Sequence, residues 1–356
     1  MQRDKKNWLD NQFVFTLLAI LMGLVLGALV LLFSGFNPLE VYRVLIEGIT
    51  SRPKYIAYDI IYATPIILTG LSVAFAFRTG LFNIGAEGQY IMGSLAAVLV
   101  GILVPAPPIL HGILCIAAGA LAGACWAGLS GLFKSQKGIS EVITGIMLNW
   151  IALYFSNFMV KNSVIALEGA DASVDILDTA SIKVQALKVD RGTILNAGIF
   201  IAIAMVIVIY IIINKTTLGY RLRAVGLNAH AAQYGGINVT RSMMVSMVIA
   251  GALAGLAGAI QVTGVQGRIN MLASQEGYGF DGLSVAMIGA NHPVGVLFAG
   301  IFFGALKYGG GKLTTVNAPS ELISIIMGCI IYFTAIATGL KQIFGQIRIG
   351  KGGKKS

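Results

Sequence analysis

Long uncharged runs of apolar residues recur along the chain and dominate its pattern. The clearest lie at 13–33, 194–213, 242–265 and 322–340. Each has about the 20 residues that an α-helix needs to cross the hydrocarbon core of a bilayer. No alternating pattern typical of membrane-spanning strands is present, and backbone amides in lipid must be paired within one segment. The pattern therefore predicts membrane-spanning helices and an all-α fold.

A longer uncharged stretch, 88–133, contains the sequence Val104-Pro105-Ala106-Pro107-Pro108, where a helix cannot continue. We interpret it as two crossings joined by a tight turn. In total the pattern fits about ten crossings, with eight to ten allowed. The eighth is short, and 277–296 fits a re-entrant segment equally well, with Asn291-His292-Pro293 as its turn. The expected crossings are 13–33, 56–77, 86–103, 109–133, 139–160, 194–213, 241–263, 281–291, 294–310 and 321–340.

The remaining segments are short, so a transmembrane domain at 13–340 accounts for nearly all of the chain. The charged stretch 1–12 and the basic tail 341–356 flank it, and 34–55 suits an amphipathic helix at the outer interface. We expect an outer loop at 161–193 and a basic inner loop at 214–240. The first apolar run lacks a small-residue cleavage pattern, which favours a retained helix over a removed signal.

Composition agrees with this picture and excludes a soluble protein. Hydrophobic residues make up 56% of the 356, charged residues only 11%, and the mean hydropathy is +0.82. If both termini are cytoplasmic, fifteen of the 25 Lys and Arg residues lie inside. The net charge of +10 then reflects the positive-inside rule in a cell-membrane protein, and not a nucleic-acid surface.

Glycines are abundant, with 45 in the chain, and several pairs are spaced four residues apart. This spacing permits close approach of helix backbones in a membrane bundle. We therefore predict helix packing at these glycines in preference to a substrate role. The pairs are Gly23 and Gly27, Gly119 and Gly123, Gly251 and Gly255, and Gly300 and Gly304.

The chain lacks signs of catalysis or of an energy source of its own. It has no phosphate-binding loop motif and no nucleophile elbow. The three histidines are scattered and the three cysteines lie in apolar spans, so no metal site is expected. Few ionisable residues, Glu87, Glu141 and Asp281, lie near the spans, which disfavours an ion-coupled carrier. An external energy source is the simpler account.

Two polar motifs interrupt the apolar pattern. The first, 78–89, reads RTGLFNIGAEGQ and fits either a cavity-lining turn at membrane depth or a solvated loop with a helix cap. The second, 218–237, lies in the basic inner loop. There Asn228 can cap a short helix that runs through Tyr234, and Gly235 or Gly236 can end it. Such a helix suits a docking element, although a lipid-anchored surface helix is the alternative.

Four stretches together resemble the permease subunits of bacterial ATP-binding-cassette importers of the branched-chain amino acid and simple-sugar class. Within that class the similarity is closest to the nucleoside importer permeases. The stretches are FRTGLFNIGAEGQ within 70–93, ISEVITGIMLNWIAL at 139–153, the loop within 217–259, and GYGFDGLSVAMIG at 277–289. They cover most of the membrane core, in order.

This resemblance implies an inward nucleoside permease that works by alternating access and binds no cofactor itself. A cytoplasmic ATP-binding subunit would use the ATP, and a second, homologous permease would complete a heterodimer. A binding lipoprotein would deliver the nucleoside to the outer surface. Many relatives have Pro after the capping Asn, where this chain has Ala229, a helpful but optional feature. The residues expected to couple to the ATPase are Arg221, Arg223, Gly226, Asn228, Ala231, Ala232 and Gly235.

For the substrate pathway we expect polar residues near the breaks in the spans. Asn149 is the most informative, because an amide at mid-span costs free energy unless it is hydrogen-bonded or faces water. An interhelical hydrogen bond is its alternative role, and packing is the alternative for Phe280. The candidate pathway residues are Asn83, Glu87, Gln89, Asn149, Phe280 and Asp281.

The substrate is the least determined feature, since no spacing encodes a purine or a ribose. Simple sugars or branched-chain amino acids remain alternative substrates. An ion-coupled secondary transporter and a membrane scaffold without transport activity are the alternative classes of protein.

Overall fold

The computed structural model describes residues 12–190, 193–319 and 321–336, and these are predominantly helical. Eight of the described helices are long and apolar enough to cross a membrane. These eight candidate spans are α1 (Gln12–Phe33), α3 (Pro53–Phe77), α4 (Ala86–Leu103), α5 (Leu110–Lys137), α6 (Glu141–Asn162), α7 (Gly198–Lys215), α10 (Val239–Gln261), which continues into the π-helical turn η3 (Val262–Gln266), and α12 (Pro293–Gly310).

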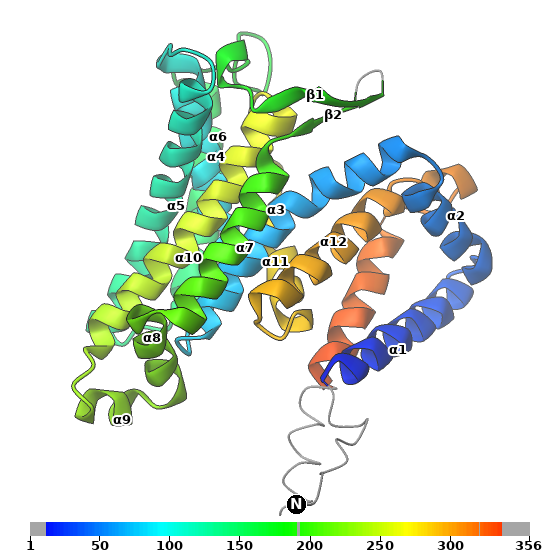
Figure 1. Ribbon diagram of the computed structural model, residues 1–356. Coiled ribbons are helices and arrows are strands. Elements are labelled where there is room, and N and C mark those ends of the chain that lie inside the picture. The colour runs from blue at the N-terminus through cyan, green and yellow to red at the C-terminus, as the bar shows by residue number, and fades with distance from the viewer. Residues whose placement is uncertain (1–11, 191–192, 320, 337–356) are drawn as a thin grey trace, which may run out of the picture. The chain divides into compact units, whose positions relative to one another are not determined.

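Shorter elements connect the candidate spans (Figure 1). They are α2 (Pro38–Thr50), η2 (Asp178–Ala180), β1 (Lys183–Asp190), β2 (Thr193–Asn196), α8 (Thr217–Leu227), α9 (Ala229–Tyr234), α11 (Tyr278–Ile288), η4 (Leu313–Val316) and an apolar helix, Leu322–Ile336.

The short eighth crossing, predicted at 281–291, contains helix α11, which has 11 residues and is about 16 Å long, roughly half the thickness of the hydrocarbon core. It ends in the turn 289–292, after which α12 begins at Pro293. The segment before α11 bonds to the loop 161–193 through Ser173, and the turn after it bonds to Arg78, beside α8. The chain from 267 to 291 therefore runs between opposite ends of the second unit, as an extended segment followed by a half-length helix. The last predicted crossing, 321–340, forms the helix Leu322–Ile336 in its described part, and 337–340 lies outside the described residues.

The chain divides into two compact units. The first comprises residues 1–51 and 306–356, of which the described parts are α1, α2, the end of α12, η4 and the helix Leu322–Ile336. Here Gly23 of α1 packs on the backbone of Ile330, and Tyr42 of α2 donates a hydrogen bond to Leu24 O at 2.6 Å. These contacts join the first and last described helices of the chain.

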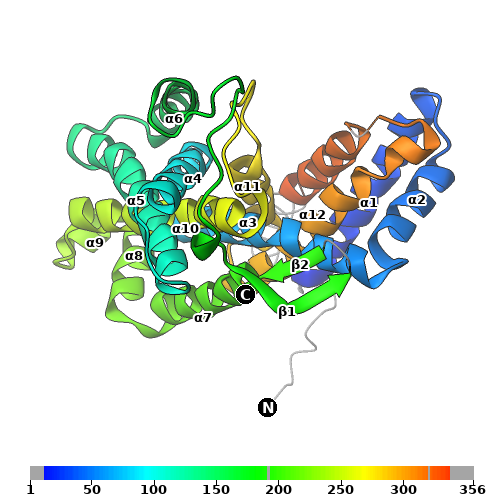
Figure 2. The same ribbon diagram turned by 90° about the horizontal axis from the view of Figure 1, so that it is seen from above.

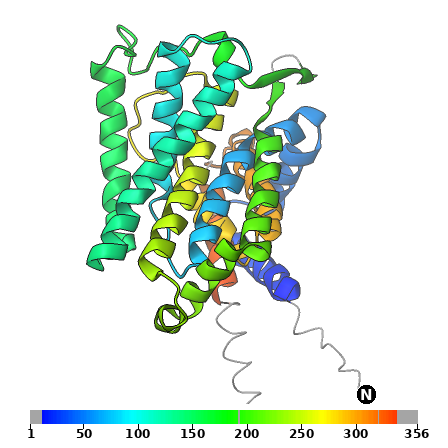
Figure 3. The same cartoon turned by 60° about the vertical axis from the view of Figure 1, so that its left-hand side comes forward.

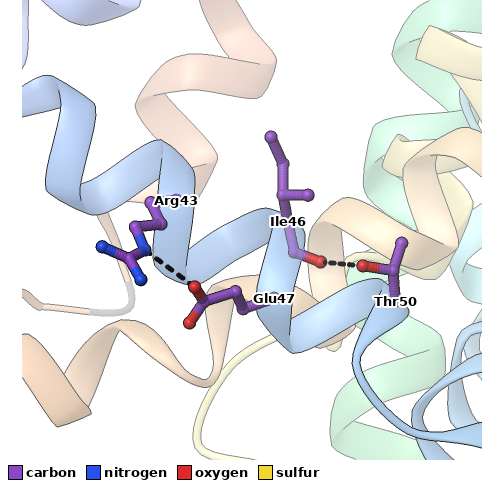
Figure 4. A network of polar contacts seen from close by, with 4 residues as sticks. All are labelled: Arg43, Ile46, Glu47 and Thr50. Atoms are coloured by element: carbon purple, nitrogen blue, oxygen red, sulfur yellow. Dashed lines mark hydrogen bonds and ion pairs between the residues drawn. The ribbon is translucent and has the colours of Figure 1, made fainter.

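Helix α2 is the amphipathic helix expected within 34–55. Asn37 caps its first turn by accepting a hydrogen bond from Leu39 N, and Val41 and Leu45 are buried. Figure 4 shows the polar side of the helix, where Arg43 and Glu47 form an ion pair at 2.8 Å one turn apart. Both side chains are exposed, so the pair contributes little to stability and mainly marks the water-facing side.

The second unit comprises residues 52–305 and is built around α3 (Figure 2). This helix is 83% buried, because α10, α11 and α7 pack along it. Helices α5 and α10 pack closely through the two glycine pairs that the sequence predicted. A Cβ atom on Gly123 would lie 2.7 Å from Gly255 Cα, and one on Gly119 would lie 3.1 Å from Gly255 O. Gly300 and Gly304 meet α3 in the same way, which confirms glycines as packing residues.

The loop predicted at 161–193 contains a feature that the sequence did not indicate. Strands β1 and β2 pair antiparallel into a hairpin, and isolated bridges join Ala166 to Ser173 and Ala172 to Asn270. The fold is therefore all-α except for this small hairpin. Figure 1 shows the hairpin at one end of the second unit, with α8 and α9 at the other end.

The predicted short helix of the basic loop is α9. Asn228 caps it by accepting a hydrogen bond from Ala231 N at 3.0 Å, and the helix ends at Tyr234. The left-handed conformation belongs to Gly236, with φ of +81°, and not to Gly235. The preceding residues, expected as loop, form a further helix, α8, that Thr216 caps through Gly219 N.

Candidate functional site

The turn between α3 and α4 contains a closed network of buried amides. Asn83 Nδ2 donates to Ser72 Oγ and to Gln89 Oε1, each at 2.9 Å, and Gln89 Nε2 donates back to Asn83 Oδ1 at 2.8 Å. All three side chains are at most 1% exposed. Because the residues at the ends of both helices are bonded to each other, the network fixes the turn where it enters the bundle.

Glu87 lies in the first turn of α4 and holds the start of the half-length helix α11. Its carboxylate accepts hydrogen bonds from Gly277 N at 2.8 Å and from Gly279 N at 2.6 Å. The acceptor is well placed, since the first N–H groups of a helix lack partners and carry a partial positive charge. Gly279 must be small, because a Cβ atom there would lie 2.5 Å from Glu87 Cα.

Helix α6 carries two asparagines whose side chains bind backbone groups of other segments. Asn149 accepts from Gly88 N at 2.7 Å and donates to Ile84 O at 3.0 Å, which holds the start of α4. Asn157 accepts from Leu272 N and donates to Leu272 O, both at 2.9 Å. In Figure 3 this helix stands at the edge of the bundle. The sequence analysis missed Asn157, although the argument applied to Asn149, an amide in an apolar span, also applies to it.

The six candidate pathway residues lie near one another. Asn83, Glu87, Gln89 and Asn149 surround the start of α4 and are bonded inside the protein. Phe280 and Asp281 lie in the first turn of α11, which Glu87 caps; Phe280 is 38% exposed. For Asn149 the structure shows the interhelical hydrogen bonds that the sequence left as an alternative. Contact of these residues with a substrate stays a prediction.

The candidate coupling residues occupy α8, α9 and their boundaries. Arg221, Asn228, Ala231 and Gly235 are exposed, whereas Ala232 is buried beneath α9. Arg221 also lines a recess with Asn238 and Arg241 at the start of α10. Of the other coupling residues, Gly226 is exposed and Arg223 is half-buried.

Gly226 and Arg78 connect α8 to the turn after α3. A Cβ atom on Gly226 would lie 3.0 Å from Gly80 N, so the two backbones touch. Arg78 Nε in turn donates to Asn291 O at 3.1 Å, in the turn between α11 and α12. Burial and the neighbouring Arg223 lower the pKa of the Arg78 guanidinium, and burial and Arg78 lower the pKa of His292. The turn at Arg78 thus contacts both α8 and the turn that follows α11.

Eight candidate spans, a half-length helix anchored inside the bundle and a capped, exposed helix at one end define a multi-pass membrane protein of the permease type. The chain belongs to the family described as the branched-chain amino acid transport system / permease component, which it matches over residues 55–335.

Three relatives illustrate the similarity. The guanosine ABC transporter permease protein NupP of Bacillus subtilis (strain 168) is 39% identical over 95% of this chain and 97% of the relative. The nucleoside ABC transporter permease protein NupB of Lactococcus lactis subsp. cremoris (strain MG1363) is 37% identical over 90% of both chains. The glucose ABC transporter permease protein TsgB13 of Haloferax volcanii is 31% identical over 94% of this chain and 88% of the relative. No solved structure matches the chain.

Proposed function

We propose that the chain is the permease subunit of an ATP-binding-cassette importer that moves nucleosides into the cell by alternating access. The observation that carries this proposal is the similarity, over nearly the whole chain, to permease proteins named for guanosine and nucleoside transport. The resemblance described in the sequence analysis also predicted nucleosides as the substrate.

A second, different permease subunit would complete the importer. Two permease proteins from Bacillus subtilis, NupP and NupQ, are similar to this chain, and both are named for guanosine transport. Lactococcus lactis likewise has NupB and NupC, both named for nucleoside transport. In each pair the chain is more similar to one member. It is 39% identical to NupP against 31% to NupQ, and 37% identical to NupB against 27% to NupC. This difference supports a heterodimer in which the chain takes one of two distinct places.

Energy would come from a cytoplasmic ATPase that docks on α8 and α9, and this chain would bind no cofactor itself. The exposed side chains of Leu227 and Tyr234, 88% and 96% exposed, flank α9 and suit burial in a partner's groove. Docking of the ATPase would place α8 and α9 in the cytoplasm. Both termini would then lie inside the cell and the loop 161–193 outside, where a binding lipoprotein would deliver the substrate.

Movement of the docked helices would reach the bundle through contacts already described. Gly226 contacts the turn at Gly80, and Arg78 in that turn donates a hydrogen bond to Asn291 O. Helix α11 connects the turn at Asn291 to Glu87. Because α11 is a single short helix tied at both ends, a displacement at α8 would shift its far end inside the bundle. That shift would open the pathway alternately to the two sides.

The proposal is tested by uptake of labelled guanosine in cells with and without this gene, in competition with unlabelled nucleosides, ribose, glucose and leucine. We expect uptake to need the gene and the partner ATPase, and only nucleosides to compete. If this chain alone supports uptake and an uncoupler abolishes that uptake, the chain is a secondary carrier instead. Unchanged uptake after deletion would indicate a scaffold.

A sugar importer is the second candidate, because the relative from Haloferax volcanii is named for glucose transport. Competition by ribose or glucose without competition by nucleosides would favour it. Competition by leucine alone would favour an amino acid importer. Either result would replace the substrate and leave the permease function in place.

A further inference from the structure

A small polar recess lies in the second unit, beside α4, α6 and the segment 266–277 that leads into α11. Its polar lining comes from Tyr90, Ser94, Ser156, Gln266, Asn270 and Glu276. None of these residues is among the six pathway candidates that the sequence suggested.

The segment that forms one wall of the recess is held rigidly. Asn157 binds both backbone groups of Leu272, and Glu87 binds Gly277 N. A third attachment joins Ile269 O to Ser173 N at 2.8 Å. Because the backbone is held at these three places, a ligand has less backbone freedom to restrict, which lowers the entropic cost of binding.

Polar groups in the recess remain available to a ligand. The Tyr90 side chain is only 1% exposed, and among the described residues its hydroxyl has no hydrogen-bond partner. The hydroxyl of Ser156 and the exposed amide of Asn270 also line the recess. A buried hydroxyl without a partner is unfavourable, so a ligand that supplies a hydrogen bond is favoured at this place.

The chemistry of the lining suits a neutral solute with hydroxyl groups and a flat ring. Gln266 Nε2 donates to Glu276 Oε1 at 3.0 Å and so orients the carboxylate. A carboxylate is a natural acceptor for the hydroxyls of a ribose. Tyr90 adds an aromatic side chain to the lining, and its ring packs against that of Tyr278 with the ring centroids 5.3 Å apart.

We propose that this recess is the place where the chain contacts its substrate, with Glu276 accepting hydrogen bonds from sugar hydroxyls and Ser156 and Asn270 pairing with further polar groups. The proposal rests on the proposed function and adds a location and a role for three residues. Glu87 and Asn157 then act as positioning residues, which hold the wall of the recess without touching the substrate.

The test compares labelled guanosine with 2′,3′-dideoxyguanosine, which lacks two sugar hydroxyls, in cells that contain the complete importer. We expect Glu276→Gln to lower guanosine uptake about tenfold, a loss typical of one charge-assisted hydrogen bond, and to change dideoxyguanosine uptake little. Ser156→Ala should also lower guanosine uptake. Ser274→Ala, an exposed serine on the same segment but outside the recess, is the matched control and should change neither.

Uptake is normalised to the amount of chain in the membrane. An unchanged guanosine rate in Glu276→Gln, or an equal loss for both substrates, would overturn the site. If the unaltered chain supports no nucleoside uptake, the proposed function itself fails, and the site fails with it.

A second measurement does not depend on transport rates. Asn270→Cys is introduced after Cys115, Cys125 and Cys329 have been replaced by Ser, and it is labelled with a water-soluble thiol reagent in the complete importer. We expect guanosine to slow the labelling at least severalfold in the presence of the binding protein, and leucine to have no effect. Labelling at the same rate with and without guanosine would overturn the proposed site.

Discussion

At the scale of single residues, the buried polar side chains of the second unit bind backbone groups where helices are interrupted. Glu87 binds the start of α11, Asn149 the start of α4, and Asn157 the segment before α11. The sequence indicated that Glu87 and Asn149 matter, because polar groups in apolar spans are costly. It could not indicate their partners, since backbone groups more than 60 residues away are brought to them only by the fold.

Replacement of Glu87 should destabilise the protein. Glu87→Ala leaves the N–H groups of Gly277 and Gly279 without an acceptor inside the bundle, at an expected cost of about 2–4 kcal/mol. Glu87→Gln keeps one acceptor oxygen and should cost less. The measurement is the midpoint of thermal unfolding in detergent, with the exposed Glu168→Ala as control. An Ala variant as stable as the control would contradict this role.

Asn157 gives a similar prediction with a close control. Asn157→Ala removes both hydrogen bonds to Leu272 and should lower stability by about 1–3 kcal/mol, with a clear loss of transport. Asn162, in the same helix, donates only to Phe158 O of its own helix. Asn162→Ala should therefore have little effect on thermal unfolding or uptake. Equal effects of the two substitutions would show that the contact with Leu272 is unimportant.

At the scale of helices, the sequence was informative wherever an apolar run was long and uninterrupted. The predicted ends of α4 agree with the structure, as does the cap of α9 by Asn228. At 281–291 the sequence predicted a short crossing, and the structure has a half-length helix, α11, that follows an extended segment; hydrophobicity alone does not locate the extended part. Helix α8 and the hairpin were missed, since both lie in polar segments without a hydrophobic period.

Close packing of α5 on α10 predicts unequal effects of the same substitution at two glycines. Gly123→Ala places a methyl group against the backbone of Gly255 and should destabilise the protein by about 1–3 kcal/mol. At Gly128 the nearest atom to an added Cβ is 3.7 Å away, so Gly128→Ala should be neutral or slightly stabilising. Thermal unfolding in detergent measures both. Equal stability of the two variants would contradict the packing.

The cap of α9 should matter for coupling more than for stability. Asn228→Ala removes the bond to Ala231 N and should weaken this short helix by about 1 kcal/mol. We expect less substrate transported for each ATP hydrolysed, with a nearly unchanged amount of chain in the membrane. Asn214→Ala, which loses a bond within its own helix α7, is the control. An unchanged ratio in Asn228→Ala would argue against docking at α9.

At the scale of the whole molecule, family membership and the helical fold identify a permease component, and the proposed importer assigns its partners. The exposed helices α8 and α9, the turn at Arg78 and the half-length helix α11 form one continuous series of contacts within the second unit. If the partner ATPase supplies the energy, as proposed, the chain should transport only when this partner moves the exposed end.

Reconstituted transport tests this central claim most directly. The chain, its homologous permease and the ATPase are placed in lipid vesicles, with the binding protein on one side and ATP on the other. We predict accumulation of labelled guanosine that requires ATP hydrolysis and disappears when 218–237 is replaced by a flexible Gly-Ser linker. Equal accumulation without the ATPase, or with the replaced segment, would contradict the account.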